Sequence, residues 1–308
     1  MAQPIPESRR EPSSRGRSTG EKRPDIIISR DNKWLKLFRG RLRGAGLRDG
    51  EPIGVEGPKL VEEGFLAGLE AEALLVSEAG EREIERILQA ASESEAGIPR
   101  GRIFRTTDKM FASVAGTETP QGVAALFRQP VWGLEDVLRG RATRDGAFRG
   151  DSALVVVLVG VQDPGNAGTI LRSAEAFDAT GAITTRGTTD PWSPKALRAS
   201  AGSALRLPLL RGMRIPVLLA QLKLQQVKIV AASSRGGTDA DADADLGVAL
   251  QEPAAIFIGN EGAGLPVEIE QAADARISIP MAEAVESLNA GVAASLLLYE
   301  AARRRKGN

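Results

Sequence analysis

Residues 155–172 combine an apolar run, a polar turn and the start of a helix. The run Val155–Val161 ends at Gln162-Asp-Pro-Gly-Asn166, and a helical pattern follows at once, which indicates a buried strand feeding a helix. Such a turn presents unpaired backbone N–H groups at the carboxyl edge of a sheet, where open α/β sheets bind ligands. Asn166 and Arg172 add an amide and a permanent positive charge. The segment therefore predicts a ligand site.

A glycine-rich loop, Gly259-Asn-Glu-Gly-Ala-Gly264, follows a predicted strand over 254–258. Glycine permits positive φ angles and a close approach of the backbone to a ligand. Many such loops only reverse the chain. The interpretation of this loop as part of a ligand site therefore depends on two motifs that follow it. They are Ile279-Pro-Met281 and Ser287-Leu-Asn289. Ser287 is placed to cap the last helix, which the pattern predicts over 284–304.

The chain has neither cysteine nor histidine among its 308 residues. Disulfides and thiolate nucleophiles are thereby excluded, and the usual general base and the commonest metal ligand are missing. Acid–base chemistry must then use carboxylates, Lys, Tyr, hydroxyls or water. The Asp-rich segment 239–245 lacks the glycine and the final glutamate of a calcium loop, which favours a solvated loop. We expect a site without metal.

In order and spacing, the three motifs resemble those of the SpoU (TrmH-like) RNA 2′-O-methyltransferases of the SPOUT superfamily, over residues 152–305. The resemblance implies an α/β domain with a parallel sheet and a trefoil knot, an exception to the usual rule against knots. It also implies methyl transfer from S-adenosyl-L-methionine to a ribose 2′-hydroxyl. The implied cofactor-binding residues are Gly259, Asn260, Gly262, Gly264, Ile279, Pro280, Met281 and Leu288.

The same resemblance implies a catalytic set, which consists of Asn166, Arg172, Glu261, Ser287 and Asn289. In the family, the arginine at the position of Arg172 contacts the target ribose and phosphate. Because arginine stays protonated and presents a rigid fork of donors, stabilisation of a developing alkoxide is favoured over proton abstraction, with a base role as the alternative. Glu261 is expected to orient either Arg172 or Asn166.

The remaining elements must position these residues. Hydrophobic residues make up 42% of the chain, which is enough to form buried hydrophobic cores. Residues 1–24 are rich in Pro, Ser, Arg and Glu and are expected to be a disordered basic tail. Alternating short strands and helices over 25–128 indicate a small α/β domain. Residues 129–151 are expected to be a linker, and 152–308 the catalytic domain, with one departure from the family at Asp178, where relatives commonly have Gly.

The first domain resembles, more loosely, the ribosomal-protein-like substrate-binding domain often fused ahead of SpoU catalytic domains. The residues that carry this likeness are Ser29, Asn32, Lys36, Val55-Glu-Gly57, Leu60-Val-Glu-Glu63 and Thr117–Gly122. Net charge is zero, but residues 1–50 hold 13 Lys and Arg against 6 Asp and Glu, which suits an anionic polymer. The candidate RNA contacts are Lys36, Arg39, Arg43, Lys195 and Arg198. The basic segment Arg303–Lys306 is the competing RNA contact.

The sequence thus predicts an S-adenosylmethionine-dependent RNA ribose 2′-O-methyltransferase. The first domain favours ribosomal RNA of the 23S type over tRNA, because tRNA-specific relatives often lack it. The rivals are a non-catalytic RNA-binding or ribosome-assembly protein on the same fold and a base methyltransferase of another SPOUT branch. The five catalytic residue types disfavour both. Neither a signal peptide nor an apolar run of about 18 residues is visible, so we expect a cytoplasmic protein.

The last predicted helix carries an apolar stripe wider than one buried face requires. Its members are Val285, Leu288, Val292, Leu296 and Tyr299, with Leu297 and Leu298 beside them. Members of the family dimerise through this region and the helix of the first motif. The resemblance therefore implies a homodimer with its sites near the interface, and burial of the stripe inside the domain is the alternative.

Overall fold

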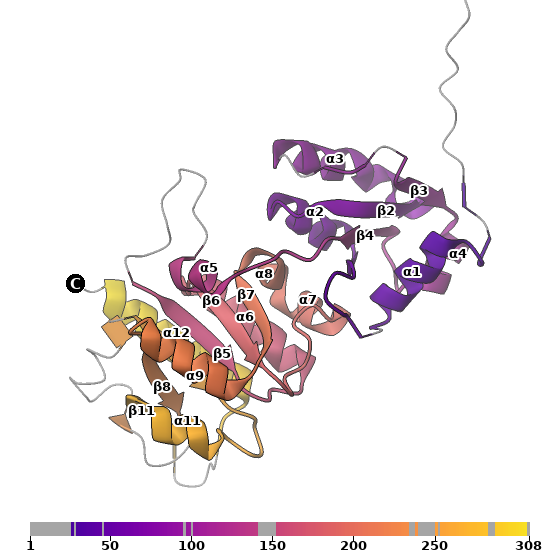
Figure 1. The fold of residues 1–308 in the computed structure, drawn as a ribbon. Helices are drawn as coiled ribbons and strands as arrows, with labels where there is room; N and C mark the ends of the chain where they lie inside the picture. Colours follow the sequence, from indigo (N-terminus) through magenta and orange to yellow (C-terminus); the bar gives the residue numbers. More distant parts are fainter. Residues whose placement is uncertain are drawn as a thin grey trace, which may run out of the picture.

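The computed structural model describes residues 26–27, 29–44, 46–94, 97–99, 101–140, 152–233, 238–239, 250–251, 253–282 and 287–306. Within these ranges the chain forms two α/β domains, which lie side by side in Figure 1. The predicted tail over 1–24, the predicted linker beyond residue 140, most of the Asp-rich segment and Val285 lie outside the described residues. No helix in the described part of the chain is long and apolar enough to cross a bilayer.

The first domain is built on a sheet with the strand order β1-β4-β2-β3. Strand β4 pairs antiparallel with β1 and β2, whereas β2 and β3 run parallel. Helices α2 and α3 cover one face of the sheet, and α1 and α4 cover the other. The elements are α1 (Lys33–Leu42), β1 (Ile53–Glu56), α2 (Pro58–Leu66), β2 (Ala71–Ser77), the 3-10 helix η1 (Glu78–Glu83), α3 (Ile84–Glu93), β3 (Ile103–Thr106), α4 (Asp108–Val114) and β4 (Val123–Phe127).

Helix α1 carries much of the basic charge of this domain. Asn32 caps it, with Oδ1 accepting a hydrogen bond from the backbone N–H of Trp34 at 2.8 Å. Apolar residues recur at three- and four-residue steps and bury one face of the helix against the sheet. These are Leu35, Phe38 and Leu42, all at most 1% exposed. The helix ends before Gly44, whose φ of 80° is a conformation that favours glycine.

The second domain has a sheet whose described strands all run parallel, in the order β7-β6-β5-β10-β8-β11-β9. This confirms the predicted parallel α/β architecture, and the trefoil knot stays a prediction. The elements are α5 (Leu134–Arg139), β5 (Leu154–Leu158), α6 (Pro164–Ala176), β6 (Gly181–Thr185), α7 (Pro194–Ser200), α8 (Ser203–Arg206), β7 (Leu209–Met213), α9 (Ile215–Leu224), β8 (Lys228–Ala232), β9 (Thr238–Asp239), β10 (Ala254–Ile258), α11 (Val267–Ala272), β11 (Ala275–Ser278) and α12 (Ala290–Lys306).

Helices cover both faces of the parallel sheet (Figure 1). Helices α5, α9 and α11 pack on one face, and α6, α7, α8 and α12 pack on the other. Side chains of β5 alternate between the two cores and are at most 1% exposed. Val155 and Val157 face the core beneath α5, α9 and α11, whereas Leu154 and Val156 face the core beneath α6, α7, α8 and α12. Burial on both faces explains why the strand reads as an unbroken apolar run.

The strand order creates a switch point beside β5. From β5 the chain moves outward through β6 to β7, and later it returns to build the sheet on the other side, through β8, β10 and β11. The loops that follow β5 and β10 therefore lead away from each other. A crevice between such loops is where parallel sheets bind ligands.

Helix α5 lies inside the segment predicted to be a linker. Its Val137 is fully buried, and a Cβ on Gly181 of β6 would lie 2.7 Å from Val137 Cγ1. The helix is therefore part of the core of the second domain. Only Gln129–Gly133 connect the two domains in the described part of this segment.

Candidate cofactor and catalytic site

A pocket of about 290 Å³ opens at the carboxyl edge of the parallel sheet. Its walls come from the ends of β8, β10 and β11 and from the first turns of α12. The lining residues are Ala232, Ser233, Ile258, Gly259, Asn260, Glu261, Gly262, Ala263, Gly264, Ile277, Ile279, Met281, Ser287, Leu288, Ala290, Ala293 and Leu297. Every predicted cofactor-binding residue except Pro280 is among them. Ala232, Ser233 and Ile277 were not predicted, although their places at strand ends are a usable signal.

The glycine loop is held in shape by Asn260. Its Nδ2 donates to the carbonyl of Gly160, after β5, at 2.9 Å, and its Oδ1 accepts from the backbone N–H of Gly262 at 2.9 Å. A Cβ on Gly259 would lie 2.6 Å from the carbonyl carbon of Gly264, so the loop folds back on itself. Gly264 has a φ of 67°. Asn260 thus ties the loops on both sides of the switch point together.

The pocket suits S-adenosylmethionine. Ile258, Ile279 and Leu288 offer apolar walls for an aromatic base, and the glycine loop offers backbone donors and acceptors for polar groups. Within the described ranges, no group of three or more acidic residues is arranged to hold a metal ion.

Three of the predicted catalytic residues form one hydrogen-bonded chain. Asn166 Nδ2 donates to Glu261 Oε1, and Asn289 Nδ2 donates to Asn166 Oδ1 at 2.9 Å. Both ends of the Asn166 amide are therefore held, one by the loop after β10 and the other by the segment before α12. In this structure Glu261 thus accepts a hydrogen bond from Asn166, one of the two partners expected for this glutamate.

Two helix starts differ from the sequence prediction. Helix α6 begins at Pro164 instead of 167, so Asn166 lies in its first turn. Helix α12 begins at Ala290 instead of 284, and Ser287 does not cap it. Asn289 takes that place, because its Oδ1 accepts from the backbone N–H of Gly291 at 2.9 Å. Ser287 lines the pocket instead.

Asp163 is a site residue that the sequence analysis missed. Its Oδ1 accepts from the backbone N–H of Asn166 at 2.9 Å and caps α6, while its Oδ2 accepts from Lys195 Nζ at 2.8 Å. The Lys195 hydrogen bond and that backbone N–H hold the pKa of Asp163 below its ordinary value of 3.8. An Asp directly before Pro-Gly at a helix start was the available signal. Lys195 of α7 is thus fixed beside the first turn of α6.

Arg172 stands apart from the hydrogen-bonded chain. It lies on α6 with its side chain exposed, and no described residue forms a hydrogen bond or an ion pair with it. Arg198 on α7 is exposed too. A Cβ on Gly168 would lie 2.5 Å from the carbonyl oxygen of Ala196, so α6 and α7 pack backbone to backbone. This contact brings the cations of α7 beside α6, which carries Asn166 and Arg172.

The candidate RNA contacts on α1 have partners in their own domain. Lys36 Nζ lies 3.0 Å from Asp31 Oδ1, with both side chains more than half exposed. Arg39 Nε donates to the carbonyl of Ser113 at 3.3 Å, and Arg43 Nη2 donates to the same carbonyl at 2.9 Å. The two arginines therefore tie α1 to the end of α4. The carbonyl is a neutral partner, so these hydrogen bonds do not neutralise the two charges.

The C-terminal basic cluster is compensated within its own domain. Arg303 and Arg304 both pair with Glu300, whose pKa they lower, Arg303 more than Arg304. Lys306 Nζ lies 2.7 Å from Asp178 Oδ2. Asp178 has a φ of 59°, a left-handed conformation that favours glycine, the residue that the family resemblance leads us to expect there.

Arg305 serves the fold. Its Nη1 donates to the carbonyl of Ser152 and its Nε to that of Leu250, both at 2.7 Å. Burial lowers the pKa of Arg305 to about 10. The guanidinium thus anchors the end of α12 to the start of β5.

Solved structures share this fold. The SpoU methyltransferase AviRb from Streptomyces viridochromogenes, crystallised with AdoMet, is 25% identical with a TM-score of 0.71, over 90% of this chain and 100% of that one. An rRNA methyltransferase from Sinorhizobium meliloti is 27% identical with a TM-score of 0.73, over 91% and 97%. Fold and pocket together define an RNA methyltransferase that uses S-adenosylmethionine.

The sequence comparisons name the family. Residues 153–299 match the model of the SpoU rRNA Methylase family, and residues 50–125 match the MRM3-like substrate binding domain. A protein of Mycobacterium avium that is named an uncharacterized tRNA/rRNA methyltransferase is 32% identical over 92% of this chain and 88% of its own length. The 23S rRNA (guanosine(2553)-2′-O)-methyltransferase RlmP of Bacillus subtilis is 29% identical over 80% and 86%. This chain belongs to the SpoU rRNA methylase family.

Proposed function

We propose that this protein methylates a ribose 2′-hydroxyl of ribosomal RNA. The observation that carries the proposal is the chain Glu261–Asn166–Asn289, which stands at the pocket formed by the glycine loop, with Arg172 exposed on the same helix as Asn166. The name of the RlmP relative, a 23S rRNA 2′-O-methyltransferase, supports both the ribose oxygen and the RNA.

Bound S-adenosylmethionine supplies an electrophilic methyl group on sulfur. In the transfer, a bond forms between the ribose oxygen and the methyl carbon, the sulfur–carbon bond breaks, and the hydroxyl proton leaves to water. The pocket walls bind the cofactor and exclude water from it. Asn166, held by Glu261, orients the reacting groups, and Arg172 stabilises the negative charge that develops on the ribose oxygen.

Ribosomal RNA is preferred to tRNA because of the first domain, which matches the MRM3-like substrate binding domain. Mapping of ribose methylation across total RNA, from cells with and without the protein, tests this choice. We expect one ribosomal position to lose its methyl group in the absence of the protein and in cells that carry Arg172→Ala. Loss confined to a tRNA would favour the alternative substrate, and an unchanged map would contradict the activity.

Division of labour between the domains is the next part of the proposal. Residues 25–128 hold the RNA, and residues 152–305 carry out the transfer. The basic surplus of α1 supports this, because Arg39 and Arg43 donate to neutral carbonyls. The C-terminal cations, by contrast, already have carboxylate or buried partners.

A homodimer completes the proposal. Val292, Leu296 and Tyr299 are 48%, 45% and 52% exposed and form one stripe on α12, while Leu297 and Leu298 beside them are buried. Phe177, the C-cap residue of α6, packs edge-to-face on Tyr299 with the ring centroids 5.6 Å apart, which extends the stripe to the end of that helix. We expect light scattering to give the mass of a dimer for the wild-type protein and of a monomer for Leu296→Glu. A monomer mass for both would contradict the dimer.

A further inference from the structure

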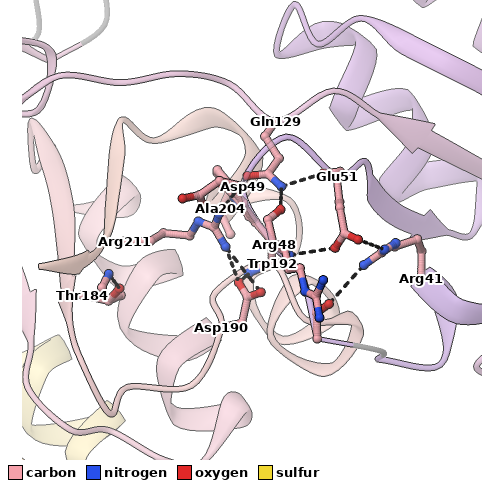
Figure 2. A network of polar contacts seen from close by, with 12 residues as sticks. Arg41, Arg48, Asp49, Glu51, Gln129, Thr184, Asp190, Trp192, Ala204 and Arg211 are labelled. Atoms are coloured by element: carbon pink, nitrogen blue, oxygen red, sulfur yellow. Dashed lines mark hydrogen bonds and ion pairs between the residues drawn. The ribbon is translucent and has the colours of Figure 1, made fainter.

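Arg211 of β7 bridges the two domains on one side of their contact. It stacks on Trp192 at 4.3 Å and lies 3.4 Å from Asp190 within the catalytic domain. Across the contact, its Nη2 donates to Gln129 Oε1 at 2.7 Å and to Asp49 Oδ1 at 3.1 Å (Figure 2). The arginine side chain is 17% exposed. Stacking and pairing from both domains hold the guanidinium in one orientation.

Hydrogen bonds also hold the loop that contains Asp49, the partner of Arg211 in the first domain. Gln129 Nε2 donates to the carbonyls of Arg48 and Glu51, both at 2.6 Å (Figure 2). The Glu51 carboxylate accepts from the backbone N–H of Arg48 at 2.8 Å and pairs with Arg41 at the end of α1. Arg211 is thereby connected through the loop to the basic helix α1.

Arg206 of α8 forms a second bridge. It donates to Glu63 of α2 in the first domain, and its Nε and Nη2 donate to Glu175 of α6, both at 2.7 Å. The three side chains are at most 27% exposed. The hydrogen bonds to Glu175, more than the attraction of Glu63, raise the pKa of Arg206 above its ordinary value.

The backbone leaves little freedom at this second bridge. Gly202, between α7 and α8, has a φ of 90°, and a Cβ there would lie 3.1 Å from Glu63 Cβ. One apolar cluster also continues from the α2–α3 core of the first domain into the α6–α12 core of the second. The bridges made by Arg206 and Arg211 therefore flank an apolar contact between the domains and fix how the two domains are aligned there.

The Glu63–Arg206–Glu175 bridge ends on the catalytic helix. Glu175 follows Arg172 by three residues on α6, about one helical turn. Helix α2 of the first domain is thus connected through Arg206 to α6, the helix that carries Asn166 and Arg172. A change in the position of the first domain would act directly on α6.

We propose that Arg206 and Arg211 are positioning residues that fix the RNA-holding domain relative to helix α6. RNA bound by the first domain would then present its target ribose at one set distance from Asn166 and Arg172. This inference rests on the proposed function. It identifies the substrate as a folded RNA whose recognition element and methylated ribose are held at a fixed spacing, rather than a short flexible strand.

The test uses the full chain with Arg206→Ala and Arg211→Ala, singly and together. We expect the double variant to lose about 10- to 100-fold in single-turnover methylation of the folded RNA, because small misplacements of reacting groups carry penalties of that size. Its Kd for the same RNA and for S-adenosylhomocysteine should change less than about threefold, since neither arginine is placed in a binding site. Small-angle scattering should show a broader distribution of distances between the domains.

Arg128→Ala is the matched control, because Arg128 pairs with Glu70 inside the first domain and bridges nothing. It should behave as wild type in all four measurements. Glu63→Gln is the milder variant if the alanine variants fold poorly, since it leaves the Arg206–Glu175 pair intact. It should reproduce part of the rate loss, with RNA affinity unchanged.

The outcomes separate this inference from the proposed function. A double variant with wild-type rate and wild-type scattering would overturn the inference. Loss of RNA affinity in parallel with rate would also overturn it, in favour of direct RNA contact by the arginines. If the wild-type protein methylated no ribose at all, the proposed function would fail, while the scattering comparison would still decide whether the arginines fix the domains.

Discussion

Asn166 is held by residues far from it in sequence, Glu261 on one side and Asn289 on the other. The three residue types and their order were visible in the sequence, and only the resemblance to a family placed them in one site. The sequence left open whether Glu261 pairs with Arg172 or Asn166 and did not predict the bond from Asn289, because both depend on where the loop after β10 and the segment before α12 meet the first turn of α6. Nor did the sequence indicate that Arg172 lies outside the hydrogen-bonded chain of Glu261, Asn166 and Asn289.

At this scale the first prediction concerns Arg172. Arg172→Ala should lower the single-turnover rate of methylation by about 10²–10³-fold, because a preorganised donor to developing charge is lost. Arg172→Lys should restore little, since a point charge does not reproduce the guanidinium fork. Calorimetry should show unchanged binding of S-adenosylhomocysteine. Near-normal turnover by the alanine variant would refute the assigned role.

A second prediction concerns the cofactor pocket. Gly264→Val should abolish binding of S-adenosylhomocysteine, because a β-branched residue is strained at a φ of 67° and its side chain adds bulk to the pocket wall. Gly133→Ala is the control, since Gly133 does not line the pocket, its φ is −93° and its Cβ would meet nothing closer than 3.5 Å. Titration calorimetry with and without a chelator measures both. Full affinity in the valine variant, or affinity that depends on metal, would contradict this pocket.

Among the elements, buried strands were the most predictable. Strand β10 occupies the predicted residues 254–258, because an apolar run bounded by polar turns leaves little freedom. The start of α12 was predicted too early, since the apolar periodicity continues through residues that belong to the site. Helix α8 and strand β7 were not predicted, because they are too short to show a clear periodicity.

The cap of α6 leads to a prediction about pH. Asp163 has a lowered pKa in the folded protein, so its charge stabilises the fold above its ordinary pKa of 3.8, and this contribution is lost as the pH falls through the lower, folded value. Asp163→Asn keeps a capping oxygen but removes the charge. Urea unfolding should show the variant to be less stable at neutral pH and the difference to shrink below pH 3.8. A difference that grew on acidification would contradict the sign.

For the whole molecule, two α/β domains and their order were predictable from composition and periodicity. Their relative placement was not, because the bridge between Arg206 and Glu63 joins residues 143 positions apart. The total charge of a segment was likewise predictable, but the partners of its charged side chains were not. The basic surplus near the N-terminus was countable. Only the fold reveals that Arg303 and Lys306 pair with carboxylates, whereas Arg39 and Arg43 donate to a neutral carbonyl.

That asymmetry leads to the last prediction. Lys36→Gln, Arg39→Gln and Arg43→Gln together should weaken RNA binding across sequences and flatten its salt dependence, by about one unit of slope per lost phosphate contact. Glutamine retains an N–H donor for the Ser113 carbonyl, which favours retention of the fold. Affinity for S-adenosylhomocysteine should stay unchanged.

The matched comparison is Arg303→Gln with Lys306→Gln, which removes C-terminal charge and spares the buried Arg305. Because Glu300 and Asp178 already compensate these two cations, the double variant should bind RNA with nearly the wild-type affinity and salt slope. Gel-shift titrations of both variants at two salt concentrations decide between the two surfaces. If only the C-terminal variant lost affinity, RNA would be held by the catalytic domain, and the first domain would need another role.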